Sequence, residues 1–242
     1  MPSRLDQLKA ELRKAVNPEK ATFFPGFFKA PAGYPKDDKF LGVVVPGQRK
    51  VAKLFKDLPL DDIEKLLVSE WHEERLTALF IMVGQFQRGA AANKKVIYEL
   101  YMRCRKHIDN WDLVDSSAGQ IVGAWLDDRP EKLEVLQRLA SSDIWYERRI
   151  AMIATFDYIK KGRADEALVI AEQLLHDKQD LIHKAVGWML RELGKRVDQS
   201  LLAAFLDQHA ATMPRTALRY AIEHFTPERR QHYLSLKRTM KS

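Results

Sequence analysis

The chain has 242 residues, of which 46% are hydrophobic and 10% aromatic, a composition that buries a substantial core and excludes an intrinsically disordered protein. Its 40 Lys and Arg against 33 Asp and Glu give a net charge of +7, which suggests a polyanionic partner such as nucleic acid, or an anionic membrane surface. Cys104 is the single cysteine, so an internal disulfide is excluded.

Targeting signals are not apparent in the sequence. The amino-terminal segment is charged and amphipathic and lacks the apolar core of a signal peptide. No run of residues approaches the roughly 18 uninterrupted apolar positions of a membrane span. We therefore expect a soluble protein of the cytoplasm, associated with the nucleoid if the source is bacterial.

The first 60 residues mix helical and irregular patterns. Residues 3–16 are predicted to form a helix that ends at Asn17 and Pro18. Residues 23–35 are dense in phenylalanine, proline and glycine, so we predict no long regular element there, but a segment that packs against the body or cradles a ligand. Residues 40–46 have the composition of a strand without a partner strand, and are predicted to connect two helices.

From residue 48 onward the apolar spacing is helical almost throughout. Asp61, Asn93, Asp143 and Asp198 are predicted to cap helices at their amino ends, and Gly89 and Gly162 to end them. The predicted helices cover residues 48–58, 61–69, 70–87, 93–106, 111–126, 131–141, 144–160, 164–175 and 181–195, and two more begin near Gln199 and Thr216.

The helices alternate between ordinary amphipathic segments and segments that carry charged residues beside small ones. Markers in the second series lie 40, 33, 36 and 31 residues apart, at Arg75, Asp115, Arg148, Lys184 and Arg215. This spacing is typical of HEAT-type repeats, in which one helix of each pair lines a concave surface. The sequence therefore predicts an all-α HEAT-like repeat solenoid of antiparallel helix pairs, a single domain over residues 1–242. Its concave basic face, with Arg148, Arg149, Lys184, Arg191, Arg215 and Arg219, would suit a duplex backbone.

Trp111 and Asp115 are four residues apart, so on a helix they share one face. An aromatic face and a carboxylate both attract cations, and the small residues 116–119 would leave room for a ligand to approach. The alternative is a buried tryptophan and a solvated aspartate. Metal-ligand, nucleotide-binding and nucleophile-elbow motifs are not found in the sequence, so we expect no cofactor.

Two further tryptophans have basic neighbours. Trp145 lies within one turn of Arg148 and Arg149, which either contact phosphate or are solvated beside a core tryptophan. Trp188 is flanked by Lys184 and Arg191 on one helical face. The glycine before it, Gly187, indicates close approach of either another helix or a nucleic-acid backbone.

Four segments in order, NWDLVDSSAG, IWYERRIAM, HKAVGWMLRELGK and MPRTALRYAIE, with FLGVVVP upstream, resemble the AlkD-type DNA alkylation repair glycosylases. The resemblance implies a HEAT-like-repeat enzyme that hydrolyses the N-glycosidic bond of cationic N3- and N7-alkylated purines in duplex DNA, without a metal and without base extrusion. It places the catalytic pair on Trp111 and Asp115 and a second tryptophan on Trp188. The active-site arginine falls on Arg148 or its neighbour Arg149, and an early tyrosine on Tyr34.

The expected activity is therefore excision of 3-methyladenine and 7-methylguanine in base excision repair, by a monomer. Arg148, Arg149, Lys184, Arg191, Arg215 and Tyr34 are the expected DNA contacts. The alternative is a non-catalytic HEAT-repeat protein that binds damaged or branched DNA. A third possibility, a protein-binding helical scaffold, predicts weak duplex binding that is insensitive to salt.

Overall fold

The computed structural model describes residues 2–28 and 38–236. These residues fold into helices joined by short connections; over this part of the chain the only extended pairing is an isolated bridge between Lys39 and Trp71. The chain divides into two compact units, residues 1–121 and 122–242. The predicted all-α fold of paired helices is confirmed, and none of the described helices is long and apolar enough to cross a membrane.

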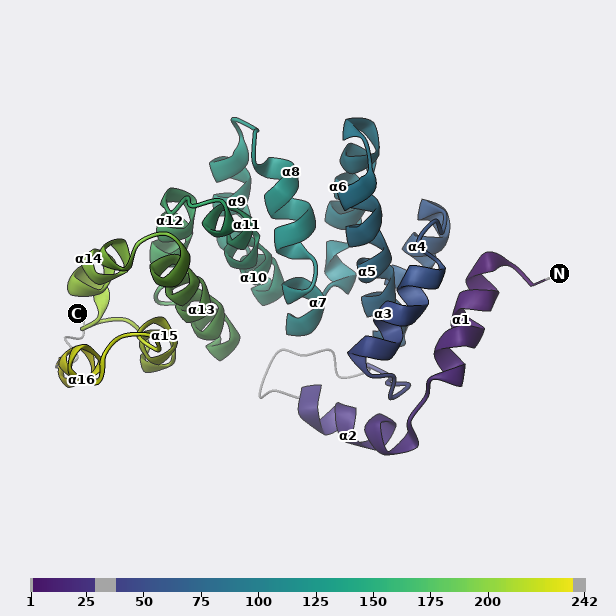
Figure 1. Ribbon diagram of the computed structural model, residues 1–242, viewed down its shortest axis with the longest axis horizontal. Helices are drawn as coiled ribbons and strands as arrows, with labels where there is room; N and C mark the ends of the chain where they lie inside the picture. Colours follow the sequence, from purple (N-terminus) through teal and green to yellow (C-terminus); the bar gives the residue numbers. More distant parts are fainter. Residues whose placement is uncertain (1, 29–37, 237–242) are drawn as a thin grey trace. The chain divides into compact units, whose positions relative to one another are not determined.

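The first unit is organised around α5, a 17-residue helix whose middle, residues 76–82, is apolar on most sides. It packs against α3, α4, α6 and α7 (Figure 1). A helix that is hydrophobic all round is buried, and α5 is buried from its first residue. The helices are α1 (Arg4–Lys14), α2 (Pro18–Phe28), α3 (Val45–Leu54), α4 (Leu60–Leu67), α5 (His72–Arg88), α6 (Ala91–Cys104) and α7 (Trp111–Asp115).

The second unit is organised around α13, which packs against α10, α11, α12, α14 and α15 (Figure 1). At Gly187 a Cβ atom would meet Tyr220 Cβ at 2.6 Å, so the close neighbour of this glycine is the helix α15 and not a ligand. The helices are α8 (Ala124–Leu126), α9 (Lys132–Ala140), α10 (Trp145–Ala154), α11 (Phe156–Lys160), α12 (Asp165–Gln173), α13 (Asp180–Arg196), α14 (Gln199–His209), α15 (Arg215–Ala221) and α16 (Pro227–Ser235).

The aromatic segment differs from the prediction. Residues 18–28 form the helix α2, with Pro25 inside it. Asn17 explains its start, because the Asn17 side chain accepts a hydrogen bond from the Lys20 amide at 3.1 Å and Pro18 needs no amide partner in the first turn. Pro25 costs only one backbone bond so near the end of α2. Residues 40–44 lie between α2 and α3, as predicted, but Val45 and Pro46 belong to the first turn of α3.

Several predicted boundaries are also wrong. The continuous helix over 111–126 is interrupted: α7 ends at Asp115 and a π-helical turn, Gly119–Gly123, precedes α8. A Cβ on Gly123 would press on the Ala154 backbone, so tight packing against α10 sets this irregular path. Asp198 caps α14 as predicted. Asp61, Asn93 and Asp143 do not cap their helices, because α4, α6 and α10 begin after Pro59, Ala90 and Ile144. The helix α16 was not predicted. The single domain and the concave basic face stay predictions.

Candidate active site on α7

The helix α7 carries the predicted pair at its two ends. Asn110 caps it, since its buried side chain accepts a hydrogen bond from the Trp111 amide at 2.8 Å. Leu113 and Val114 are fully buried and anchor the helix, which leaves Trp111 and Asp115 partly exposed. Trp111 is therefore not a buried core residue, and the two predicted side chains lie one turn apart at the surface of the first unit.

The residues after Asp115 pack inward. Ser117 and Ala118 are fully buried, so the expected space for a ligand at the small residues is filled by the protein itself. Ser117 donates to the Leu113 carbonyl at 2.6 Å, and its oxygen lies 3.1 Å from the Tyr101 hydroxyl. Burial raises the pKa of Tyr101, and the negative charge of Asp115 raises it further. The Asp115 carboxylate thus lies near a phenol that stays neutral.

Trp111 is in contact with α2. The Phe28 ring is stacked on the indole with centroids 5.8 Å apart, and Phe27 meets it edge-on at 6.2 Å. Phe27 remains 55% exposed, as does Phe23 at 56%. The described part of the aromatic segment, residues 23–28, packs against the body at the candidate site, which was one of the two predicted alternatives.

Sequence reasoning missed the polar cluster beneath these rings. His72, the first residue of α5, has its Nδ1 2.9 Å from Asp38 and its Nε2 2.8 Å from Asp112. Burial alone would lower the pKa of His72, but the two carboxylates outweigh burial and raise it to about 9. At neutral pH the ring is therefore an imidazolium that donates to both acids.

Arg75 extends this cluster by one turn of α5. Its guanidinium lies 2.5 Å from Asp38 and 3.3 Å from Asp109. Burial raises the pKa of Asp109 to about 6, although Arg75 opposes the rise. Two cations, His72 and Arg75, are thus buried with three carboxylates at the point where α5 meets α7.

The two residues between His72 and Arg75 bind other segments. Glu73 is buried and accepts hydrogen bonds from three successive amides, Leu41 at 2.9 Å, Gly42 at 2.7 Å and Val43 at 3.1 Å. Glu74 accepts from Arg13 of α1 at 2.8 Å. The run HEER at positions 72–75 therefore joins α1, the 38–43 connection and α7 to the core helix.

In the second unit, Trp188 lies between Lys184 and Arg191 on one face of α13. It is partly exposed, and its indole contacts the Phe156 ring at 5.9 Å. Lys184 pairs with Asp180 at 2.8 Å and keeps 42% of its side chain exposed. Arg191 binds Glu223, and a second acid, Glu192, lies 3.2 Å away.

The predicted arginines are held by the protein. Arg148 forms a two-pronged pair with Asp177, at 2.5 and 3.1 Å, and donates to the Ser142 carbonyl at 2.8 Å. Arg149 is 4% exposed and donates to the Leu181 carbonyl. Arg215 donates to the Leu234 carbonyl at 2.6 Å.

Two predicted aromatic residues do not belong to a described site. Trp145 is a core tryptophan, 8% exposed, and Tyr34 lies outside the described residues.

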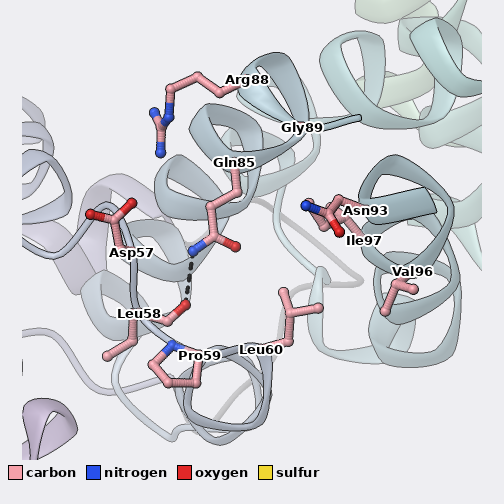
Figure 2. Close-up of a pocket in the computed structure, with 10 residues that line it drawn as sticks. All are labelled: Asp57, Leu58, Pro59, Leu60, Gln85, Arg88, Gly89, Asn93, Val96 and Ile97. Carbon is pink, nitrogen blue, oxygen red and sulfur yellow. Dashed lines mark hydrogen bonds between the residues drawn. The ribbon is translucent and has the colours of Figure 1, made fainter. Parts of the chain in front are cut away.

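A pocket of about 440 Å³ lies elsewhere in the first unit. Figure 2 shows its lining by Asp57, Gln85, Arg88 and Asn93, among others, with the Gln85 amide bonded to the Leu58 carbonyl. Gln85 and Arg88 belong to the carboxyl end of α5, about 20–24 Å along the helix from His72 at 1.5 Å per residue. It is therefore separate from the α7 site.

A second groove, of about 370 Å³, lies between α3 and α5. Four cations and no acidic side chain are among the residues that line it: Arg49, Lys53, Lys56 and Arg88. The Arg49 guanidinium lies 4.1 Å above the Phe80 ring, which fixes one of these charges. Among the described residues, no group of three or more His, Cys, Asp or Glu is arranged to hold a metal ion.

Comparison with known proteins places the chain. None of the curated proteins matches the sequence. The structure is similar to a solved one, "Predicted DNA alkylation repair enzyme from Enterococcus faecalis", with a TM-score of 0.69 and 17% identity over 88% of this chain and 97% of that chain, a likeness that shows the fold. A family model described as "DNA alkylation repair enzyme" matches residues 8–225. Because that match spans most of the sequence, the chain belongs to the DNA alkylation repair enzyme family.

Proposed function

We propose that the protein is a monofunctional DNA glycosylase that removes cationic N3- and N7-alkylated purines, such as 3-methyladenine and 7-methylguanine, from duplex DNA. One observation carries the proposal: Trp111 and Asp115 stand partly exposed at the two ends of α7 in a chain of this repair family. The product is an abasic site, the substrate for the later steps of base excision repair.

The chemistry follows from the lesion. An alkylated purine is already cationic, so the bond between its nitrogen and the sugar C1′ breaks with both electrons leaving on the base. Positive charge moves to the sugar as an oxocarbenium-like species, as in glycoside hydrolysis. The ionised Asp115 stabilises this charge, and water adds to C1′ with loss of one proton. A strong general acid is not required, since the leaving base departs neutral.

Aromatic faces bind the cationic base. The Trp111 indole supplies such a face at the site, and a cation on an aromatic ring contributes about 0.5–2 kcal/mol. Trp188, between two cations on α13, is proposed as a further aromatic contact to the DNA. The Tyr101 phenol, hydrogen-bonded to Ser117, stays neutral and so adds no second negative charge beside Asp115.

The phosphate backbone is proposed to bind basic side chains of both units. In the first unit these are the cations of the groove between α3 and α5. In the second unit they are Lys184, Arg191 and Arg215, together with Arg148 or Arg149. Since these arginines have acidic or carbonyl partners, a phosphate must share or replace those partners.

The test is abasic-site formation on duplexes that contain one 7-methylguanine or 3-methyladenine. Asp115→Asn is expected to lower the single-turnover rate about 100-fold or more, because a charge that acts only in the transition state is lost. Asp128→Asn, a change at an exposed acid of the second unit, is the matched control and should keep the wild-type rate. Equal rates for wild type and Asp115→Asn would refute the catalytic assignment.

Binding separates the proposal from its rivals. A DNA-binding repeat protein without activity would bind the lesion duplex and form no abasic sites. A protein scaffold would bind duplex DNA weakly at all salt concentrations. For the groove, the double variant Arg49→Ala/Lys53→Ala should reduce the salt dependence of DNA affinity by about two phosphate contacts, while Lys95→Ala on α6 should not.

A further inference from the structure

The buried histidine beside α7, His72, is the first residue of α5 and has two acidic partners. The His72 side chain is 2% exposed, and its two ring nitrogens contact carboxylates that come from different segments, Asp38 of the 38–43 connection and Asp112 of α7. Only the protonated ring donates at both nitrogens. His72 therefore bonds α5 to two segments at once.

One of these bonds leads directly to the proposed catalytic tryptophan. Asp112 is the residue after Trp111, and α7 has only five residues, too few to be stable alone. The Asp112 Oδ1 accepts from the Leu113 amide at 2.9 Å, which leaves its Oδ2 for His72 at 2.8 Å. The orientation of the first turn of α7 is thus set from α5 through a charged hydrogen bond.

A second connection runs through aromatic rings. The His72 ring lies 4.8 Å from Phe28 and 5.0 Å from Phe40, between centroids. Phe28 in turn is stacked on Trp111 at 5.8 Å. An imidazolium attracts the aromatic faces beside it, so the charge on His72 holds Phe28 in the position in which it covers one face of the indole.

The other charged groups around His72 depend on the same proton. Arg75 contacts Asp38 and Asp109, Lys39 pairs with Glu70, and α2 contributes the Phe28 ring. His72 and Arg75 face Asp38, Asp109 and Asp112, so the cluster has one net negative charge with His72 protonated and two with it neutral. Loss of the proton leaves Asp112 without a cationic partner among these groups.

We propose that His72 is a positioning residue for the Trp111–Asp115 site, which fixes α7 through Asp112 and the Trp111 indole through Phe28. The proposal rests on the proposed function only for its effect on catalysis. The effect on the geometry of Trp111 is independent of any activity, so the two can fail separately.

The direct test follows the indole resonances of 15N-labelled protein, with Trp111 assigned through Trp111→Phe. In the wild type, the Trp111 resonance should shift as the pH is raised, with a midpoint near the His72 pKa of about 9. Trp125 and Trp188 of the second unit serve as internal controls and should not follow this titration. His72→Gln should shift the Trp111 resonance at neutral pH and abolish its titration. A Trp111 resonance that neither titrates nor responds to the variant overturns the proposal.

Catalysis supplies the second readout. His72→Gln is expected to lower the single-turnover rate on 7-methylguanine duplex about 10- to 100-fold, because misplacement of the site by about 1 Å costs that much, while the duplex Kd changes less than about twofold. The exposed His176→Gln is the matched control. Asp112→Asn, which keeps His72, should reproduce both effects. If either variant fails to fold, the pH titration of the wild-type Trp111 resonance still tests the proposal. A wild type without excision refutes the proposed function, and the indole titration still decides the positioning role.

Discussion

The Phe28 ring covers one face of the Trp111 indole, with the centroids 5.8 Å apart and the rings 29° from parallel. This contact ties α2, the helix of the aromatic segment, to the candidate site on α7. It also determines which side of the tryptophan a ligand reaches. The covered side is occupied by the protein, and the indole remains partly exposed, so a ligand is expected to reach it from a side that Phe28 does not cover.

The first prediction concerns this contact. Phe28→Ala should raise acrylamide quenching of Trp111 fluorescence, measured as the difference from Trp111→Phe, because the covered face becomes open to solvent. It should also reduce the free energy of unfolding in urea by about 2 kcal/mol, less than the 3–5 kcal/mol of a fully buried phenylalanine. Phe27→Ala is the matched control on the next residue, since Phe27 is 55% exposed. Equal quenching in the two variants would contradict the stacked geometry.

The second prediction concerns the buried carboxylate of Glu73, which holds the 38–43 connection. Glu73 accepts three backbone amides, and a glutamine there would remove the charge and aim an amide N–H at donors. Since hydrogen bonds to a charged group contribute about 1.5–3 kcal/mol, Glu73→Gln should lower the free energy of unfolding by about 2–4 kcal/mol.

The control for Glu73 lies three residues away. Glu70 pairs with Lys39 at 2.8 Å, and both side chains are more than half exposed. Glu70→Gln should therefore change the stability by less than about 1 kcal/mol. Urea denaturation of both variants measures the difference, and a similar loss in the two would show that Glu73 does not hold the connection through its charge.

The third prediction compares two glycines with the same backbone conformation. Gly42 has φ +83° and Gly162 has φ +79°, so alanine is strained at both positions. A Cβ on Gly42 would lie 2.5 Å from the Ala21 amide nitrogen of α2, whereas a Cβ on Gly162 has no neighbour within 4 Å. Gly162→Ala should cost about 1 kcal/mol and Gly42→Ala clearly more, since α2 must move. Thermal unfolding of the two variants decides; equal losses would exclude the close approach of α2.

How much of the site is predictable depends on the range of its contacts. The cap of α7 by Asn110 and the shared face of Trp111 and Asp115 are local, so the sequence pattern contains them. The pairs of His72 with Asp38 and Asp112 span 34 and 40 residues, and no local pattern links them. One signal was present: residues 76–82 of α5 are so apolar that the helix must be buried, and its charged start at 72–75 with it.

The fold shows the same division. Helical periodicity gave the long helices of both units, because their apolar faces are read from neighbouring residues. It missed α2, where Pro25 and Gly26 argued against a helix that the Asn17 cap and the Phe28 contacts stabilise. It also missed the break after Asp115, which the packing of Gly123 against the Ala154 backbone imposes from another helix. Contacts from distant segments decided each of these positions.

The last prediction is the pH dependence of stability. The pKa of His72 is raised from 6.5 to about 9 in the folded protein, so the charged ring stabilises the fold. This stabilisation is complete below pH 6.5 and is lost as the pH rises through 9, and its size is about 3 kcal/mol at 1.4 kcal/mol per pH unit. The wild-type free energy of unfolding should therefore fall between pH 6.5 and 9.5, whereas that of His72→Gln should change little.

Two other groups define the range of this measurement. Burial raises the pKa of Asp109 to about 6, so the contribution of Asp109 to stability changes with pH only below the chosen range. Burial raises the pKa of Cys104 to about 11, so its contribution changes mainly above pH 9 and is the same in the wild type and in His72→Gln. Urea titrations at pH 6.5, 8 and 9.5 therefore isolate His72, as the difference between wild type and His72→Gln at each pH. Parallel curves for the two proteins would mean that His72 is neutral in the fold, and that its bonds to Asp38 and Asp112 are not both donated by an imidazolium.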